Sequence, residues 1–216
     1  AADVATVFSA SEGDGRNCHD LCEALASSDR MVSPTRFTNS VHTAPAGYWH
    51  IATHSMAPST SLCAHDASFA TGLMEAALQV QASQAPVLLV VADAPYPEPL
   101  HSTRPLPDSM AIAMLLGPWL AADGDANHQG LATLTLDYRS AAADATTSSC
   151  DLADMQSLTR ALPAARGLPL LQAIARGTAS DFTASDFTAT NTCAIDCFDD
   201  LTLHISVVHA HAKPTA

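Results

Sequence analysis

The feature that most limits the fold is a short, wholly apolar segment at residues 87–92, Val-Leu-Leu-Val-Val-Ala, directly after Pro86. Six residues are too few for a helix, but they suit a β-strand buried on both faces. Residues 66–82 place Phe69, Leu73 and Ala77 on one face of a predicted helix. A helix that leads into a buried strand predicts an α/β fold, with a mixed sheet covered by helices.

The rest of the chain has the same mixture of patterns. Further strands are expected at residues 3–10, 59–63, 110–116, 131–138 and 201–208, and further helices at 16–27, 39–54, 151–162 and 169–176. An extended segment is expected at 33–37. Residues 93–108 contain five prolines and are expected to form a long loop, a kind of segment that often carries function. We expect one domain over residues 1–216, with a mixed sheet of about five strands.

The charge balance limits the class of partner. Nine Lys and Arg against 22 Asp and Glu give a formal net charge of −13, which disfavours nucleic acid and anionic membrane surfaces. No apolar run reaches the roughly 20 residues of a spanning helix, and the start does not resemble a leader. We therefore expect a cytoplasmic protein. Residues 1–9 already resemble a strand, which suggests that an upstream segment is missing. A five-residue tandem repeat at 178–187 is interpreted as a variable loop.

The cysteines leave two interpretations open. Cys18, Cys22, Cys193 and Cys197 form two pairs with the same spacing and could bind zinc. Structural zinc ligands usually lie on loops, whereas Cys18 and Cys22 fall within a helical pattern, so buried free thiols are the favoured interpretation. The histidines near the end of the chain, His204, His209 and His211, are a weaker metal alternative. We predict neither a metal nor a cofactor.

Residues 57–69 predict a strand, a tight turn and the start of a helix. Such an elbow places one side chain in the field of the helix dipole, where a thiol would ionise and become a good nucleophile. Here the residue at the helix start is Asp66. We expect its carboxylate to cap the helix by accepting free backbone N–H groups.

This segment resembles the nucleophile elbow of the β-ketoacyl synthases. Ala57-Pro58-Ser59 and His65-Asp66-Ala67 have the spacing of the family's Gly-Pro-Ser and Ala-Cys-Ser, with Asp66 in place of the cysteine. Ser33-Pro34 and Ala46-Gly47 also agree with the family pattern. The closer resemblance is to the β-ketoacyl synthase-like N-terminal family, which includes chain-length-factor-type subunits of aryl polyene and related type II polyketide systems. It is specific over about residues 33–118, and it implies half of a thiolase-like fold.

The resemblance implies a pseudo-enzyme. An acyl thioester would form only an unstable anhydride with Asp66, and the two catalytic histidines of full ketosynthases belong to a C-terminal half that this chain is expected to lack. The implied function is that of a non-catalytic chain length factor in polyketide or fatty-acid-type biosynthesis. It would form a heterodimer with a catalytic β-ketoacyl-ACP synthase, and would meet the acyl carrier protein through that complex.

Two further sets of residues follow from the resemblance. One set would shape the partner's acyl tunnel, and for its aromatic members ordinary core packing is an equal alternative: Arg36, Phe37, His42, Tyr48 and Trp49. Within it, Phe37 or Arg36 would help to set product length. The other set would pair antiparallel with the equivalent strand of the partner: Val87, Leu88, Leu89, Val90 and Val91. A strand this apolar is an aggregation hazard if it lies unpaired at a sheet edge.

The alternative function is an enzyme active in its own right. It would decarboxylate at the altered elbow or transfer an acyl group from Cys63, which lies three residues before Asp66. We expect Cys63 to be a small core residue instead, since it falls within a predicted strand. His42 and His65 are candidate bases, but structural hydrogen bonding is the more common role of such histidines.

Overall fold

The computed structural model describes residues 3–118, 130–140, 147–176, 191–198 and 200–209. The strands are β1 (Ala5–Ala10), β2 (Ser59–Cys63), β3 (Val87–Asp93), β4 (Met110–Leu116), β5 (Ala132–Ser140), β6 (Asn191–Phe198) and β7 (Leu201–His209). The helices are α1 (Gly15–Ala26), α2 (Pro34–Thr38), α3 (Ala44–Thr53), α4 (Ser68–Ser83), α5 (Leu100–Thr103), α6 (Ala153–Ala161) and α7 (Leu168–Arg176), with 3₁₀ turns η1 (His65–Ala67) and η3 (Ala164–Gly167). None of the helices in these ranges is both long and apolar enough to cross a membrane.

The described strands form two sheets. The first has the order β2-β1-β3-β4, in which β1 runs parallel to β2 and β3, while β4 is antiparallel to β3. The second is antiparallel, with the order β5-β7-β6. The predicted α/β class and the mixed sheet are confirmed. The sequence did not predict β6 or the second sheet that β6 completes.

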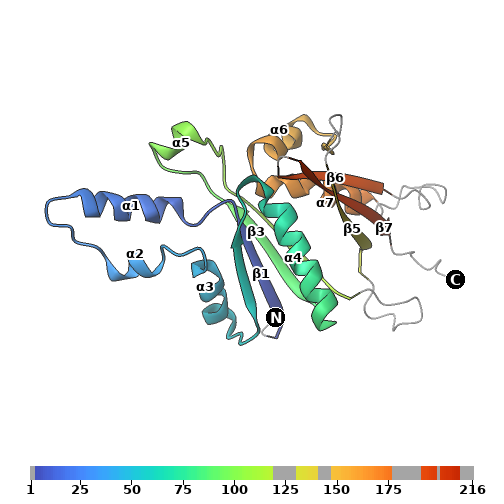
Figure 1. Cartoon of the computed structure of the whole chain (residues 1–216), viewed down its shortest axis with the longest axis horizontal. Helices are drawn as coiled ribbons and strands as arrows, with labels where there is room; N and C mark the ends of the chain where they lie inside the picture. Colours follow the sequence, from blue (N-terminus) through green and yellow to red (C-terminus); the bar gives the residue numbers. More distant parts are fainter. Residues whose placement is uncertain (1–2, 119–129, 141–146, 177–190, 199, 210–216) are drawn as a thin grey trace.

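Helix α4 is the centre of the molecule and contacts both sheets (Figure 1). Its side chains Phe69, Leu73 and Ala76 are fully buried. The helix approaches the first sheet closely because residue 72 is glycine: a Cβ there would lie 2.8 Å from Cβ of Ser9. Gly167 of η3 allows a similar approach from the other side, since its Cβ would lie 2.1 Å from the ring of Phe69.

Strand β3 lies inside the first sheet, which corrects the prediction that Val87, Leu88, Leu89, Val90 and Val91 form an interface strand. Leu89 pairs with Val7 of β1 on one side and with Met114 of β4 on the other. Val87, Leu89 and Val91 are fully buried. Because both edges of β3 are already hydrogen-bonded, no partner strand can be added there. The edge strands of this sheet are β2 and β4.

Helices α1, α2 and α3 form an N-terminal arm, and α1 and α2 extend away from the sheets (Figure 1). Residues 33–37, predicted to be extended, instead begin α2: Ser33 is the N-cap residue and Pro34 takes the first helical position, where proline is favoured. Helix α3 packs on β1 and β2, where Trp49 meets the ring of Phe8 edge-on at 6.3 Å. Of α1, only Asn17 and Leu21 are buried.

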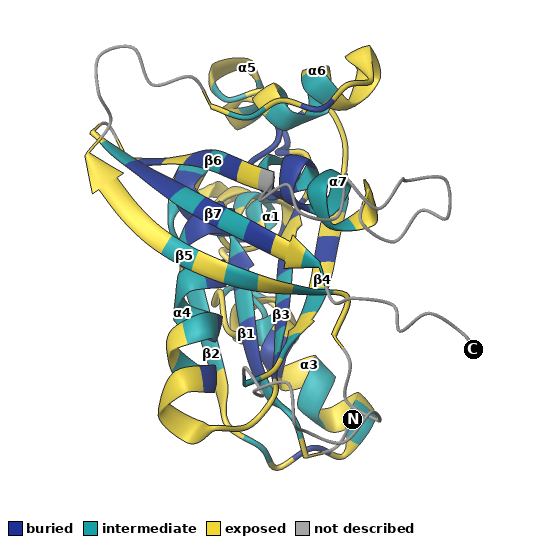
Figure 2. Cartoon of the chain, turned by 90° about the vertical axis from the view of Figure 1, so that its right-hand side faces the viewer, coloured by how far each residue is buried: buried dark blue, intermediate teal, exposed yellow. Residues whose placement is uncertain are grey.

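Burial therefore differs sharply between parts of the chain. In Figure 2, β1, β3 and much of β7 are buried or half-buried, whereas β5 is mostly exposed. The tandem repeat at 178–187 and His211 lie outside the described residues.

Candidate functional site

The predicted elbow is present. Strand β2 ends at Cys63, η1 turns the chain, and α4 begins at Ser68. His65 has φ 51°, a left-handed conformation that costs a non-glycine residue roughly 1–2 kcal/mol. The buried Ser68 hydroxyl holds the turn: it accepts from the backbone N–H of Ala64 at 3.3 Å and lies 2.7 Å from the carbonyl oxygen of Ala10. The sharp turn presents the side chains of His65 and Asp66 at the tip.

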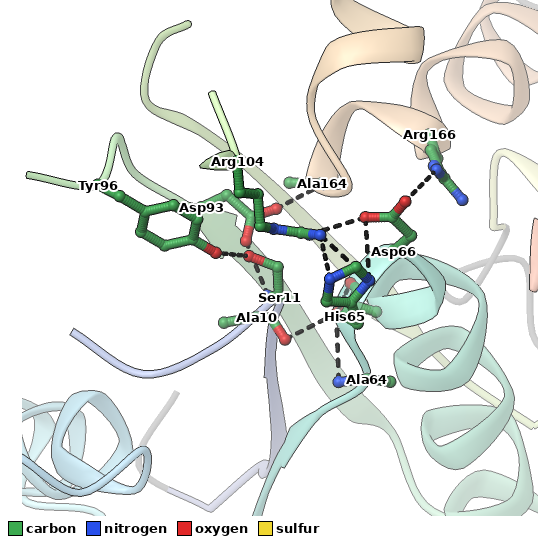
Figure 3. Close-up of polar contacts among 11 residues, drawn as sticks. Ala10, Ser11, Ala64, His65, Asp66, Asp93, Tyr96, Arg104, Ala164 and Arg166 are labelled. Carbon is green, nitrogen blue, oxygen red and sulfur yellow. Dashed lines mark hydrogen bonds and ion pairs between the residues drawn. The ribbon is translucent and has the colours of Figure 1, made fainter. Parts of the chain in front are cut away.

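Asp66 lies between two arginines from distant parts of the chain (Figure 3). Nη2 of Arg104 donates to Oδ1 at 2.7 Å, and Nη2 of Arg166 donates to Oδ2 at 3.0 Å. Arg104 follows α5 and Arg166 belongs to η3. The predicted helix cap is wrong: the N-cap residue of α4 is Ala67, without a side-chain cap, and the Asp66 carboxylate pairs with the guanidinium groups instead.

These contacts keep Asp66 ionised. Partial burial opposes ionisation, but the hydrogen bond from Arg104 and the charges of Arg166, Arg104 and His65 outweigh it and lower the pKa of Asp66. Burial likewise opposes the charge on Arg104, yet its hydrogen bonds to Asp66 and Tyr96 raise its pKa. His65 completes the cluster, with Nδ1 3.4 Å from Oδ1 of Asp66. The residue at the elbow tip is thus an ionised carboxylate that forms ion pairs with Arg104 and Arg166.

A buried network holds the elements that supply these arginines. Oδ1 of Asp93 accepts from the backbone N–H of Ser11 at 2.8 Å, and Oδ2 accepts from the backbone N–H of Ala164 at 2.7 Å. The hydroxyl groups of Ser11 and Tyr96 are 2.9 Å apart (Figure 3). Asp93 therefore joins the ends of β1 and β3 to the first residue of η3, which carries Arg166.

Sequence reasoning missed Asp93, Tyr96, Arg104 and Arg166. The proline-rich loop was a usable signal, because Tyr96 and Arg104 lie within it. Nothing near Arg166 in the sequence indicates its role, since it lies 100 residues from Asp66.

Cys63 is exposed at the end of β2, so the prediction of a core residue is wrong. Partial desolvation of the thiol and the nearby carboxylates of Glu12 and Asp93 raise its pKa. A raised pKa leaves less thiolate at neutral pH than a free cysteine has. The position is accessible but poorly suited to a nucleophile.

The residues predicted to shape a tunnel all lie in the N-terminal arm: Arg36, Phe37, His42, Tyr48 and Trp49. Phe37 and Tyr48 are 68% and 55% exposed, so core packing does not explain them. Trp49 is half-buried and packs edge-on against the half-buried ring of Phe8. Arg36 is exposed and pairs with Asp20, and His42 is exposed between α2 and α3. A role for these five residues in a tunnel remains a prediction.

The four-cysteine zinc site does not form. Cys18 and Cys22 are exposed on α1, whereas Cys193 and Cys197 are buried on β6. The buried-thiol prediction holds for Cys150, Cys193 and Cys197, and it is wrong for Cys18 and Cys22. In the described part of the chain, no three His, Cys, Asp or Glu side chains are grouped to hold a metal ion. His204 and His209 lie on β7, with Nε2 of His209 3.0 Å from the carbonyl oxygen of Ala173.

Comparisons with known proteins agree with this geometry. Residues 1–177 match the model of the β-ketoacyl synthase, N-terminal domain family. No curated protein sequence matches the chain.

Two solved structures share the fold. One is the ketosynthase (ApeO) in complex with its chain length factor (ApeC) from Xenorhabdus doucetiae, with 21% identity and a TM-score of 0.64 over 94% of this chain and 69% of that chain. The other is the ishigamide ketosynthase/chain length factor, with 14% identity and a TM-score of 0.66 over 98% of this chain and 74% of that chain. These similarities confirm the predicted thiolase-like fold. The chain belongs to the β-ketoacyl synthase N-terminal domain family.

Proposed function

We propose that the chain is a non-catalytic, ketosynthase-like subunit of the chain-length-factor type, which pairs with an active β-ketoacyl-ACP synthase. The observation that carries this proposal is the elbow tip, where the Asp66 carboxylate binds Arg104 and Arg166; we propose that Asp66 stands where an active ketosynthase has its nucleophile. Family membership supplies the context, and both similar structures are named for ketosynthases with chain length factors. The proposed setting is polyketide or fatty-acid-type biosynthesis, with aryl polyene synthesis as the favoured case.

The chemistry at the elbow supports a pseudo-enzyme. A ketosynthase nucleophile must attack a thioester and then release the acyl group to a carbanion, which a thiolate does well. An ionised carboxylate is a weak nucleophile, and both oxygens of Asp66 already accept hydrogen bonds from guanidinium groups. Acyl transfer at this position would have to break both ion pairs before it began.

We propose that the partner docks at the outer edge of β2. Strand β3, which was predicted to form the interface, lies inside the sheet and cannot do so. Strand β2 pairs only with β1 in the described sheet, so its other edge offers backbone groups to a further strand. Beside it, large apolar side chains are exposed on and after α3: Tyr48 at 55%, Ile51 at 71% and Met56 at 96%. The other edge strand, β4, contacts η3 within the chain.

The N-terminal arm is the proposed source of tunnel-shaping side chains. Phe37 is exposed on α2 and makes little contact within its own chain, so it is available to another molecule. Product chain lengths from a complex that carries Phe37→Ala test this role. Longer products are expected, and an unchanged profile would exclude Phe37 from length control.

The decisive experiment is co-expression with candidate β-ketoacyl-ACP synthases, read by native mass spectrometry. A one-to-one heterodimer is expected. In parallel, the isolated chain is incubated with acyl and malonyl carrier proteins, and its intact mass is measured. We expect no acyl adduct and no turnover without the synthase. Turnover by the isolated chain that Cys63→Ser abolishes would establish the alternative enzyme and refute the pseudo-enzyme.

The same preparation tests whether the acyl carrier protein meets this subunit only through the complex. Cross-linking of the carrier protein to the heterodimer and to the isolated chain separates the two cases. We expect cross-links with the heterodimer alone, because a chain with net charge −13 offers little attraction to an acidic carrier.

A further inference from the structure

The start of α1 forms one wall of a pocket of about 350 Å³. The opposite wall comes from Pro97, in the loop before α5, and from Leu100, the first residue of α5. Two thiols and two carboxylates line the pocket: Cys18, Cys22, Glu12 and Asp14. The pocket lies between the arm and the segment that contains α5, and its cysteines have no part in the function proposed for the chain.

Cys18 and Cys22 are four residues apart on a helix, so their side chains project from the same face, one turn from each other. Both are exposed and free. Both residues also line the same pocket, so the two thiols open onto one cavity. Two accessible thiols on one face are a bidentate ligand set for a thiophilic cation.

The charge around the pair favours a cation. Glu12 and Asp14 place carboxylates in the same pocket. Their negative charges attract a bound cation. Asp14 is fixed in place because its Oδ1 accepts from the backbone N–H of Asn17 at 2.9 Å.

The number of ligands selects the type of metal. Structural zinc sites use four protein ligands and catalytic ones three, but no third His, Cys, Asp or Glu in the described part of the chain joins the pair in a metal-binding arrangement. The adjacent His19 is engaged elsewhere, with Nε2 3.3 Å from Glu23. Cu(I) prefers sulfur and is satisfied by two thiolates.

We propose that Cys18 and Cys22 form a two-thiolate site for Cu(I) at the mouth of this pocket. Binding forms two Cu–S bonds and releases the two thiol protons to solvent, without any change of oxidation state. The site does not depend on the pairing with a ketosynthase.

The test is an anaerobic titration of the full chain with Cu(I), in competition with the chromophoric chelator bicinchoninate. One tight equivalent per chain is expected. Cys18→Ser and Cys22→Ser should each lower the affinity of the chain for Cu(I) by more than about 100-fold, since loss of a ligand should cost more affinity than loss of a group that only supports a ligand. Cys63→Ser is the matched control, because Cys63 is also exposed but lies on β2. It should retain the site.

X-ray absorption of the loaded protein should give sulfur as the only ligand type, with two scatterers. The proposal fails if either α1 variant binds Cu(I) as tightly as the native chain, if Cys63→Ser causes the same loss, or if the spectrum shows nitrogen ligands. Because both α1 residues are exposed, the serine variants should keep the circular dichroism spectrum of the native chain.

Discussion

The centre of the molecule and its N-terminal arm are built in opposite ways. Around α4, large apolar side chains such as Phe69, Leu73 and Leu89 are fully buried between helices and sheets. In the arm, Phe37, Tyr48 and Ile51 are apolar or aromatic and more than half exposed. The centre is complete within one chain, whereas the arm leaves apolar surface that water solvates poorly. The centre therefore provides stability, and the arm is the region that we propose contacts the partner.

The largest expected effect contrasts Phe69→Ala with Ile51→Ala. Removing the buried ring of Phe69 should lower the free energy of unfolding by about 3–5 kcal/mol. Ile51 is 71% exposed, and its truncation should change the free energy of unfolding of the isolated chain by less than about 0.5 kcal/mol. Urea denaturation of both variants measures the two values. Similar losses would mean that the arm is packed in solution and that the contrast is false.

Two glycine substitutions test the same contrast by adding a methyl group instead of removing side-chain atoms. Gly167→Ala inserts a Cβ that would overlap the ring of Phe69, and it should destabilise by about 1–3 kcal/mol. Gly47→Ala in α3 meets nothing within 4 Å and should stabilise by up to about 1 kcal/mol through helix propensity. Thermal melts of the two variants should shift in opposite directions. A stabilising Gly167→Ala would contradict the close packing of η3 on α4.

The arm's proposed role is tested by Ile51→Asp in the heterodimer. A charge in an apolar interface should weaken binding to the synthase at least about tenfold, or about 1.4 kcal/mol. The control is Leu115→Asp on β4, since Leu115 is 67% exposed but lies on the opposite edge strand. Biolayer interferometry with the immobilised synthase measures both. If both variants bound the synthase equally weakly, the proposal that the partner docks at the β2 edge would no longer be supported.

The smallest effect concerns the ion pairs of Asp66. Its pKa is lower in the folded chain than the usual 3.8, so its stabilising contribution is present at neutral pH and is lost as pH falls through the folded pKa. Asp66→Asn should therefore cost below about 1 kcal/mol at pH 7, because the side chain is 47% exposed and the pairs are partly screened. As the pH falls below 3.8 the deficit should shrink, because the unfolded carboxylate takes up a proton before the folded one does. A deficit that grows on acidification would show that the pairs do not stabilise the fold.

Local patterns predicted the elements well. Strands β2 and β4 were predicted with their observed bounds. Helix α2 was missed although its signals were present, with Ser33 as the cap and Pro34 in the first turn. The unbroken apolar run of β3 predicted burial correctly, yet the same run was also interpreted as an edge strand. Hydrophobicity alone does not say which of those two positions a strand takes, since that depends on pairing partners from elsewhere in the chain.

The site was predictable only in part, for the same reason. The elbow and the absence of a thiol at residue 66 follow from local residues, whereas the carboxylate's partners lie 38 and 100 residues away. Aspartate can either cap a helix or accept a salt bridge, so the residue type does not tell which of the two roles it has. Only the fold decides. Cys63 was misplaced because strand residues alternate between faces, and the exposed face was not evident from the sequence.

The two guanidinium groups around Asp66 stabilise negative charge of any kind, not specifically a carboxylate. A sulfur atom at the same tip would meet the same cations and the start of the same helix, both of which favour a thiolate. Asp66→Cys would therefore place a thiol in surroundings that favour its ionised form, next to Arg104 and Arg166.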